Sequence, residues 1–193
     1  MHEDDQLMLA HRAGDPAAFE RLLGRYRRML FGYLRRMLQD EALAEEVLIE
    51  TFYKVHRAAP EYEPRGQFKT FLFRIAYNLS LNARRDGAKW QNYVELDEQV
   101  ASARRGPDSA LPSSLADPEI QLQRRQSVDQ LNLALSRLPG VQREVFLLYY
   151  REGMETPQIS EVVGIPAGSV RAYLSMARKT LRESLEQVGL SGG

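Results

Sequence analysis

Apolar residues recur at spacings of three and four through most of the first 90 positions, which is the period of an amphipathic α-helix. The longest run begins after Asp15 and Pro16, a capping residue followed by a proline that suits the first helical turn. Further helices are predicted from about 41 to 58 and from about 67 to 85, separated by a loop rich in proline and glycine at 60–66. The apolar positions of the first run are Phe19, Leu22, Leu23, Tyr26, Leu30, Tyr33, Leu34 and Met37.

The pattern changes after residue 90. Prolines and glycines interrupt the periodicity between 91 and 117, which predicts an irregular linker. Helical periodicity resumes at about 118, and no stretch alternates apolar and polar residues as a strand does. We therefore predict an all-α fold of two small helical domains, an N-terminal one over 1–90 and a C-terminal one over 118–193, joined by a linker over 91–117.

The last two predicted helices are joined by a tight turn. Thr156 is the predicted cap of the first, and Gly164 stands where a left-handed helix end belongs. A second, amphipathic helix follows from about 167 to 187, which is the layout of a helix-turn-helix that reads the major groove. The side of this helix away from its apolar stripe, with its cationic flank, is the candidate duplex-binding face. Its members are Gly168, Ser169, Arg171, Ala172, Ser175, Met176, Arg178, Lys179 and Arg182.

The distribution of charge supports nucleic-acid binding although the total does not. The chain has 193 residues with 26 basic and 26 acidic side chains, so its formal net charge is zero. Residues 65–90 hold six bases and one acid, and residues 166–182 hold four bases and no acid. Two basic segments predict two nucleic-acid contacts, whereas ordinary solvated helix faces are the alternative interpretation.

The predicted helix over 67–85 interleaves aromatic and basic residues on the side opposite its apolar stripe. Rings stack on unpaired bases while cations hold phosphates, so this side is a candidate surface for single-stranded nucleic acid. The alternative is that Phe73 and Tyr77 pack under a neighbouring helix. Tyr62, in the preceding loop, adds another aromatic ring. The residues expected to face outward are Lys69, Phe73, Tyr77, Ser80 and Arg84.

Other chemistries find no support in the sequence. The chain has no cysteine, and its three histidines lack metal-ligand spacing. No nucleophile–base pair or phosphate-binding loop occurs, so we expect no enzyme activity, no metal and no cofactor. No apolar stretch approaches the ~18–20 residues that span a bilayer, and the acidic N-terminus is unlike a signal peptide. We therefore expect a cytoplasmic protein without membrane insertion.

Four motifs together point to a known family. They are Glu45–Phe52 (EEVLIETF), Phe71–Asn78 (FLFRIAYN), Leu138-Pro139 with Gln142–Phe146 (QREVF), and Gly164–Arg171 (GIPAGSVR). Residues 17–90 and 118–186 thereby resemble the two domains of the extracytoplasmic-function (ECF) class of bacterial sigma factors. These proteins are the promoter-recognition subunits of RNA polymerase.

The resemblance implies a role for each part of the chain. The acidic helix at 41–58 would dock on the clamp helices of the largest polymerase subunit through Glu46, Ile49 and Glu50. The following loop and helix would melt the promoter −10 element and capture a flipped base of the non-template strand. The linker would thread toward the polymerase active centre, and the helix-turn-helix would read the −35 element as duplex. Core RNA polymerase, promoter DNA and an anti-sigma factor are the implied partners. The implied base-pocket residues are Ala58, Tyr62, Ile75 and Asn78, with Lys69, Phe73, Tyr77 and Arg84 beside them.

Several positions depart from the family pattern. Ile49 stands where the docking motif usually has glutamine, and His56 stands where an aromatic is often found. On the recognition helix, Ala172, Tyr173 and Met176 replace the more usual serine and arginines. Because neither Ala172 nor Met176 can form the paired hydrogen bonds by which arginine reads guanine, we predict a weak or T-rich −35 preference.

Two functions of other classes remain as alternatives. One is a helix-turn-helix transcription regulator with an N-terminal effector domain. The other is an adaptor derived from the sigma fold that does not bind DNA. The aromatic and basic helix favours the sigma factor, since a regulator that binds only duplex needs no stacking platform.

Overall fold

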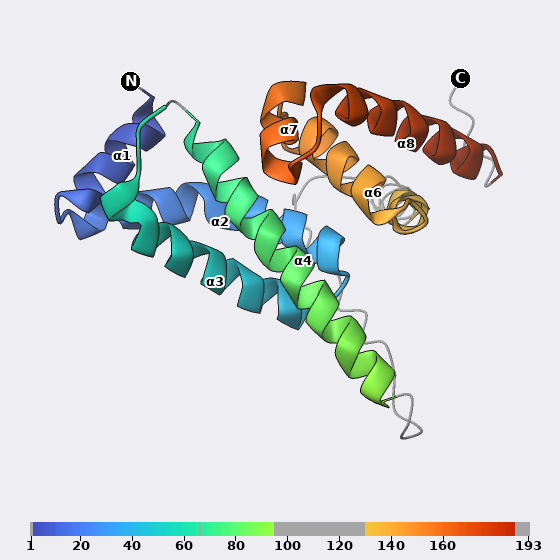
Figure 1. The fold of residues 1–193 in the computed structure, drawn as a ribbon, viewed down its shortest axis with the longest axis horizontal. Coiled ribbons are helices and arrows are strands. Elements are labelled where there is room, and N and C mark those ends of the chain that lie inside the picture. Colours follow the sequence, from blue (N-terminus) through green and yellow to red (C-terminus); the bar gives the residue numbers. More distant parts are fainter. Residues whose placement is uncertain (1, 66, 95–129, 188–193) are drawn as a thin grey trace, which may run out of the picture.

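The computed structural model describes residues 2–65, 67–94 and 130–187 (Figure 1). In the N-terminal region the helices are α1 (Glu3–Arg12), α2 (Pro16–Leu38), α3 (Glu41–Ala58) and α4 (Phe68–Val94), with a 3-10 turn at Ala59–Glu61 before α4. In the C-terminal region residues 130–136 are helical, followed by α6 (Gly140–Phe146), a π-helical turn (Leu147–Arg151), α7 (Thr156–Val163) and α8 (Ala167–Gln187). No strand occurs in the described residues, and the predicted all-α fold is confirmed.

Local capping explains where several helices begin and end. The Asp15 side chain accepts hydrogen bonds from the backbone N–H groups of Ala17 at 2.9 Å and Ala18 at 3.3 Å, as predicted for the start of α2. Gly164 ends α7 with φ of +73°, a left-handed conformation that glycine adopts without strain.

Two sequence predictions about helix ends need correction. The cap of α7 is Glu155 and not Thr156, because the Glu155 N–H donates to the Gln158 side chain at 2.9 Å in a capping box. Helix α4 continues to Val94, beyond its predicted end at 85, so the first residues of the predicted linker are helical. The remainder of that linker, up to 117, lies outside the described residues.

The N-terminal core lies between α2, α3 and α4. In Figure 1, α2 and α3 run alongside each other, α4 crosses them, and α1 lies against α2 near the 3-10 turn. Burial of apolar side chains at this centre supplies the main driving force for the bundle. Its fully buried residues include Leu22, Leu30, Tyr33 and Leu34 of α2, Val55 of α3 and Leu72 of α4.

The C-terminal helices form a second core and also contact the first region. Helix α8 packs on α6 and α7, burying the predicted stripe of Val170, Leu174, Ala177 and Leu181. Helix α7 lies against α4, and α6 touches α2 (Figure 1). The two helical regions are therefore packed directly on one another, and this contact decides which faces of α4 remain open.

Candidate polymerase and nucleic-acid interfaces

Helix α3 presents an apolar stripe between carboxylates. Ile49 is 70% exposed and Tyr53, one turn further along, is 59% exposed. Glu46 and Glu50 are exposed beside them, and Lys54 lies 3.6 Å from the Glu50 carboxylate. Such exposed large side chains rimmed by charge are typical of a docking surface. Sequence reasoning placed Glu46, Ile49 and Glu50 here but missed Tyr53, whose spacing of four from Ile49 was the available signal.

The loop before α4 is held in place by α1. Tyr62 is only 7% exposed, and its hydroxyl donates a hydrogen bond of 2.5 Å to Asp5 Oδ1 of α1. Burial, together with this bond to Asp5, raises the pKa of the Tyr62 hydroxyl. Arg12 of α1 also donates to the Tyr62 carbonyl oxygen at 3.3 Å. Sequence reasoning gave α1 no role, although its acidic first turn was visible.

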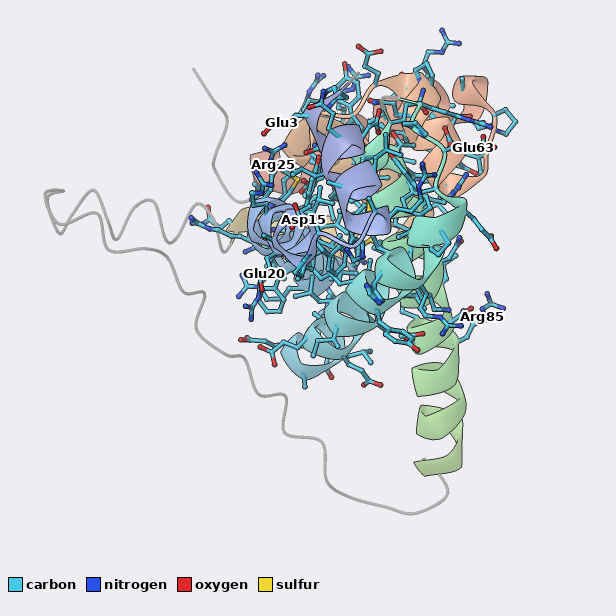
Figure 2. All side chains as sticks on the ribbon, turned by 90° about the vertical axis from the view of Figure 1, so that its left-hand side faces the viewer. Glu3, Asp15, Glu20, Arg25, Glu63 and Arg85 are labelled. Carbon is cyan, nitrogen blue, oxygen red and sulfur yellow. The ribbon has the colours of Figure 1, made fainter. Side chains whose placement is uncertain are left out.

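A second set of contacts fastens α1 to α2. The buried carboxylate of Asp4 accepts hydrogen bonds from Tyr26 and Arg25, and Arg25 Nη2 also donates to Glu3 at 2.7 Å. Figure 2 shows Glu3 and Arg25 pointing toward one another between the two helices. These paired charges position the helix that in turn positions Tyr62.

A cavity of about 250 Å³ opens beside Tyr62. The Tyr62 and Phe71 rings, whose centroids are 5.3 Å apart, line it together with two arginines and three glutamates, and each arginine pairs with one of the glutamates. Of the four residues predicted to form a base pocket, only Tyr62 lines this cavity. Asn78 is exposed, and Ala58 and Ile75 are partly buried elsewhere on α3 and α4. The cavity is lined by Glu61, Tyr62, Glu63, Arg65, Gln67, Phe71, Arg74 and Glu161.

The aromatic residues on the side of α4 opposite its apolar stripe are buried, whereas Lys69 is partly buried and Arg84 is exposed. Phe73 is 0% exposed and Tyr77 5% exposed, and Ser80 is also buried, so the expected outward orientation of these residues is wrong. The Phe73 ring meets Tyr33 of α2 edge-on, with centroids 5.2 Å apart. The physical reason is tertiary, because Phe73 packs against α2 and Tyr77 meets Glu144 of α6.

The cations on that side meet carboxylates and carbonyls of the C-terminal region. Arg84 Nη1 donates to Glu144 Oε1 at 2.9 Å, and Tyr77 also hydrogen-bonds to Glu144. Lys69 donates to the carbonyl oxygen of Glu152, and its ammonium lies 5.8 Å from the Phe73 ring centroid. Burial raises the pKa of both Glu144 and Glu152, and it lowers the pKa of Lys69.

The duplex-binding face of α8 is open. Met176 is 51% exposed, and the cations Arg171, Arg178, Lys179 and Arg182 are exposed as the helical wheel predicts. Ser169 is partly buried, whereas Gly168, Ala172 and Ser175 are exposed. The centre of this face is uncharged and its flank is cationic, an arrangement that suits base contacts flanked by phosphate contacts.

Comparison with known proteins identifies the family. The family profile "Sigma-70 region 2" matches residues 22–90, and "Sigma-70, region 4" matches residues 129–181. The chain is 35% identical over 179 residues to RNA polymerase sigma factor CarQ of Myxococcus xanthus, covering 93% of this chain and 95% of that protein. It is 27% identical to ECF RNA polymerase sigma factor SigW of Bacillus subtilis, covering 92% and 94%.

The chain belongs to the ECF class of RNA polymerase sigma factors. It is an alternative sigma factor that initiates transcription with core RNA polymerase. The fold agrees, since CnrH, solved in complex with the cytosolic domain of CnrY, superposes with a TM-score of 0.69 at 21% identity, covering 96% of this chain and 99% of that one. None of the described helices of this sigma factor combines the length and apolarity that crossing a bilayer requires.

Proposed function

We propose that this sigma factor docks on core RNA polymerase through α3, captures an unpaired −10 base beside Tyr62, and reads the −35 duplex with α8. The observation that most supports this division is that one chain carries two different candidate surfaces for nucleic acid. The cavity at Tyr62 and Phe71 combines rings with cations, and α8 offers an open face with a cationic flank. A regulator that binds only duplex needs the second surface, and an adaptor needs neither.

The docking role of α3 rests on its exposed side chains. Ile49 and Tyr53 would supply apolar contact area, while Glu46 and Glu50 would face basic residues of the clamp helices. Apolar anchors at the centre of an interface contribute most of the affinity, and charged rims contribute orientation and association rate. The unusual Ile49 therefore strengthens the apolar centre of this surface.

Reversing the rim charges tests the docking surface. We expect Glu46→Lys with Glu50→Lys to abolish binding to core polymerase, because two attractions become two repulsions on one helical face. Pull-down with core enzyme measures the loss, and circular dichroism verifies that the helices remain. Glu20→Lys with Glu41→Lys, which changes the same charge at exposed sites outside the proposed surface, is the matched control. Full retention of core binding by the Glu46/Glu50 variant would reject the assignment.

The cavity beside Tyr62 fits the proposed capture of a base. Its volume is about 250 Å³, and Phe71, which is only partly buried, would stack on the base while the largely buried Tyr62 ring lies behind it. Arg65 and Arg74 pair with Glu63 and Glu161 at the same cavity, and they would exchange these carboxylates for the strand's phosphates. Ala58, Ile75 and Asn78 remain proposed contacts of the same strand, outside the cavity itself.

Removing the ring tests base capture. Tyr62→Ala should lose about 1–3 kcal/mol of stacking and reduce promoter melting more than binding to the −35 duplex. Permanganate reactivity of the −10 strand measures melting, and duplex anisotropy measures α8 binding. Tyr62→Phe, which keeps the ring but loses the bond to Asp5, is the control that separates stacking from the docking of α1. Equal melting by Tyr62→Ala and the unmodified protein would count against the pocket.

The proposal also covers the division into domains, an anti-sigma partner and the place where the protein works. The division into domains at 1–90 and 118–193 places one nucleic-acid surface in each, and the linker over 91–117 would reach toward the polymerase active centre. The sigma factor RpoE of Bartonella quintana was solved with the anti-sigma factor NepR, and CnrH with the cytosolic domain of CnrY, which supports an anti-sigma factor as a partner of this chain. The protein would work in the cytoplasm with RNA polymerase, by binding and without catalysis of its own.

A further inference from the structure

Two histidine rings join the last turn of α1 to the last turn of α3. His11 Nε2 of α1 lies 3.0 Å from His56 Nδ1 of α3, and the centroids of the two rings are 5.0 Å apart. The sequence predicted no metal site, because ligands 45 positions apart form no local motif. Folding nevertheless brings two ring nitrogens face to face at the edge of the helical bundle.

We propose that His11 and His56 form a binding site for a divalent late-transition metal ion, with Cu²⁺ bound most tightly, and that the ion bridges α1 and α3. The two facing nitrogens would bind the ion in place of the hydrogen bond between them. Neutral imidazole is the commonest protein ligand of such ions. The site is separate from the surfaces proposed for polymerase and promoter DNA.

The separation of the two nitrogens fits such an ion. An imidazole nitrogen binds a metal at about 2.0–2.1 Å, so two of them lie about 3 Å apart when they meet at a right angle and about 3.4 Å apart at the tetrahedral angle. The observed 3.0 Å therefore favours the tetragonal geometry of Cu²⁺ over the tetrahedral geometry of Zn²⁺. The general order of affinity among these ions also places Cu²⁺ above Zn²⁺.

The surroundings of His11 hold its ring in one orientation. The ring stacks on Phe19 of α2 with centroids 4.4 Å apart, and it also hydrogen-bonds to the backbone of Asp15. A metal-binding histidine is commonly oriented in this way, by a hydrogen bond from its second ring nitrogen to a backbone carbonyl. The His56 ring is tilted by 43° to that of His11 and is exposed, so an ion can reach the pair from solvent.

Water would complete the coordination of the ion. No group of three or more histidine, aspartate or glutamate side chains in the described part of the chain could hold a metal, so the site offers two protein ligands. A structural metal centre usually has four protein ligands. We therefore expect an exchangeable ion that strengthens the contact between α1 and α3, on a chain that folds without it.

Copper binding by the full, untagged chain tests the proposal. His2 is the one other histidine and a competing ligand, so His2→Gln is present in every protein compared. Titration calorimetry measures affinity, electron paramagnetic resonance of added Cu²⁺ reports the number of imidazole ligands, and hydrogen exchange reports the docking of α1. Circular dichroism verifies that each variant keeps its helices.

The protein with His2→Gln alone should bind Cu²⁺ through two imidazole nitrogens, at least about tenfold more tightly than it binds Zn²⁺. Bound Cu²⁺ should also slow exchange of the α1 amides. Adding His56→Gln, or His11→Gln as a second variant, should leave one imidazole ligand and weaken Cu²⁺ binding at least about tenfold. Arg57→Gln, at the exposed neighbouring position of α3, is the matched control and should keep both ligands.

Other results would overturn the inference in distinguishable ways. Equal Cu²⁺ affinity with and without His56→Gln, or a single imidazole ligand in the protein with His2→Gln alone, would show that the pair is not the site. Zn²⁺ bound as tightly as Cu²⁺ would contradict the tetragonal geometry. Two imidazole ligands without slower exchange in α1 would show that the ion does not bridge the two helices of one chain.

Discussion

Helices α4 and α8 share one amphipathic pattern, but the side opposite the apolar stripe is open on α8 and largely buried on α4. Each buries an apolar stripe in its own region and carries basic residues on the opposite side. On α8 that opposite side faces solvent, whereas on α4 its ring Phe73 packs against Tyr33 of α2, and Lys69 and Arg84 meet Glu152 and Glu144 of the C-terminal region. The same local pattern therefore gives an open face on one helix and a packed face on the other, because contacts with other elements decide which side chains stay exposed.

Truncating one side chain on each helix should give the largest contrast. Phe73→Ala removes a fully buried ring and should lower the free energy of unfolding by about 3–5 kcal/mol. Met176→Ala removes an exposed side chain and should change it by no more than about 0.5 kcal/mol. Urea unfolding of the two variants measures both values. Equal stability of both variants would contradict the difference between the two faces.

Adding an arginine to the open duplex-binding face of α8 should change its DNA sequence preference. Met176→Arg provides the paired donors that read guanine, which are worth about 1–3 kcal/mol of discrimination. We expect tighter duplex binding and a preference for a guanine-containing −35 site, measured by selection from randomised duplex. Glu183→Gln, which raises the net charge by the same one unit two turns further along α8, is the control for charge alone. A sharp G/C-rich preference of the unmodified protein would show that α8 does not dock through this face.

A change of pH should have a smaller effect, on the packing of the C-terminal region against α4. Because burial raises the pKa of Glu144 and Glu152, the chain with its two regions packed together binds protons more readily than a chain with the regions apart. Packing of the regions is therefore favoured as pH falls from neutral toward the raised carboxyl range, and it weakens as pH rises. The charged and titratable groups around the two carboxyls are Tyr33, Arg36, Lys69, Tyr77, Arg84, Arg143 and Arg151. Energy transfer between dyes at Arg28→Cys in α2 and Glu183→Cys in α8 should rise from pH 7.5 to pH 5.5, and a fall would contradict this sign.

The sequence predicts which side chains a helix buries through its own amphipathic pattern, but it does not predict which side chains distant elements cover. Periodicity placed Val170, Leu174, Ala177 and Leu181 in the core and exposed Met176, because local amphipathicity decides both. The same reasoning turned Phe73 and Tyr77 outward on α4. It failed there because the residues that these rings meet, Tyr33 of α2 and Glu144 of α6, are distant in sequence, and no local pattern encodes such contacts.

The cavity beside Tyr62 also depends on residues that the sequence alone does not bring together. The family resemblance pointed to Tyr62 in the loop at 60–66, and the cavity joins that loop to Phe71 and Arg74 of α4 and Glu161 of α7, which the sequence did not predict. The role of α1 was also missed, since the bond from Tyr62 to Asp5 connects residues 57 positions apart. Side-chain types near a motif can be read from sequence, whereas the partners brought by folding cannot.

Transcription by core RNA polymerase with this chain, on a library of randomised promoters, tests the central claim most directly. The account predicts transcripts that require the chain and that enrich a defined −10 motif, together with a weak or T-rich −35 motif. Transcription that remains at the level of core enzyme alone, across the whole library, would contradict it.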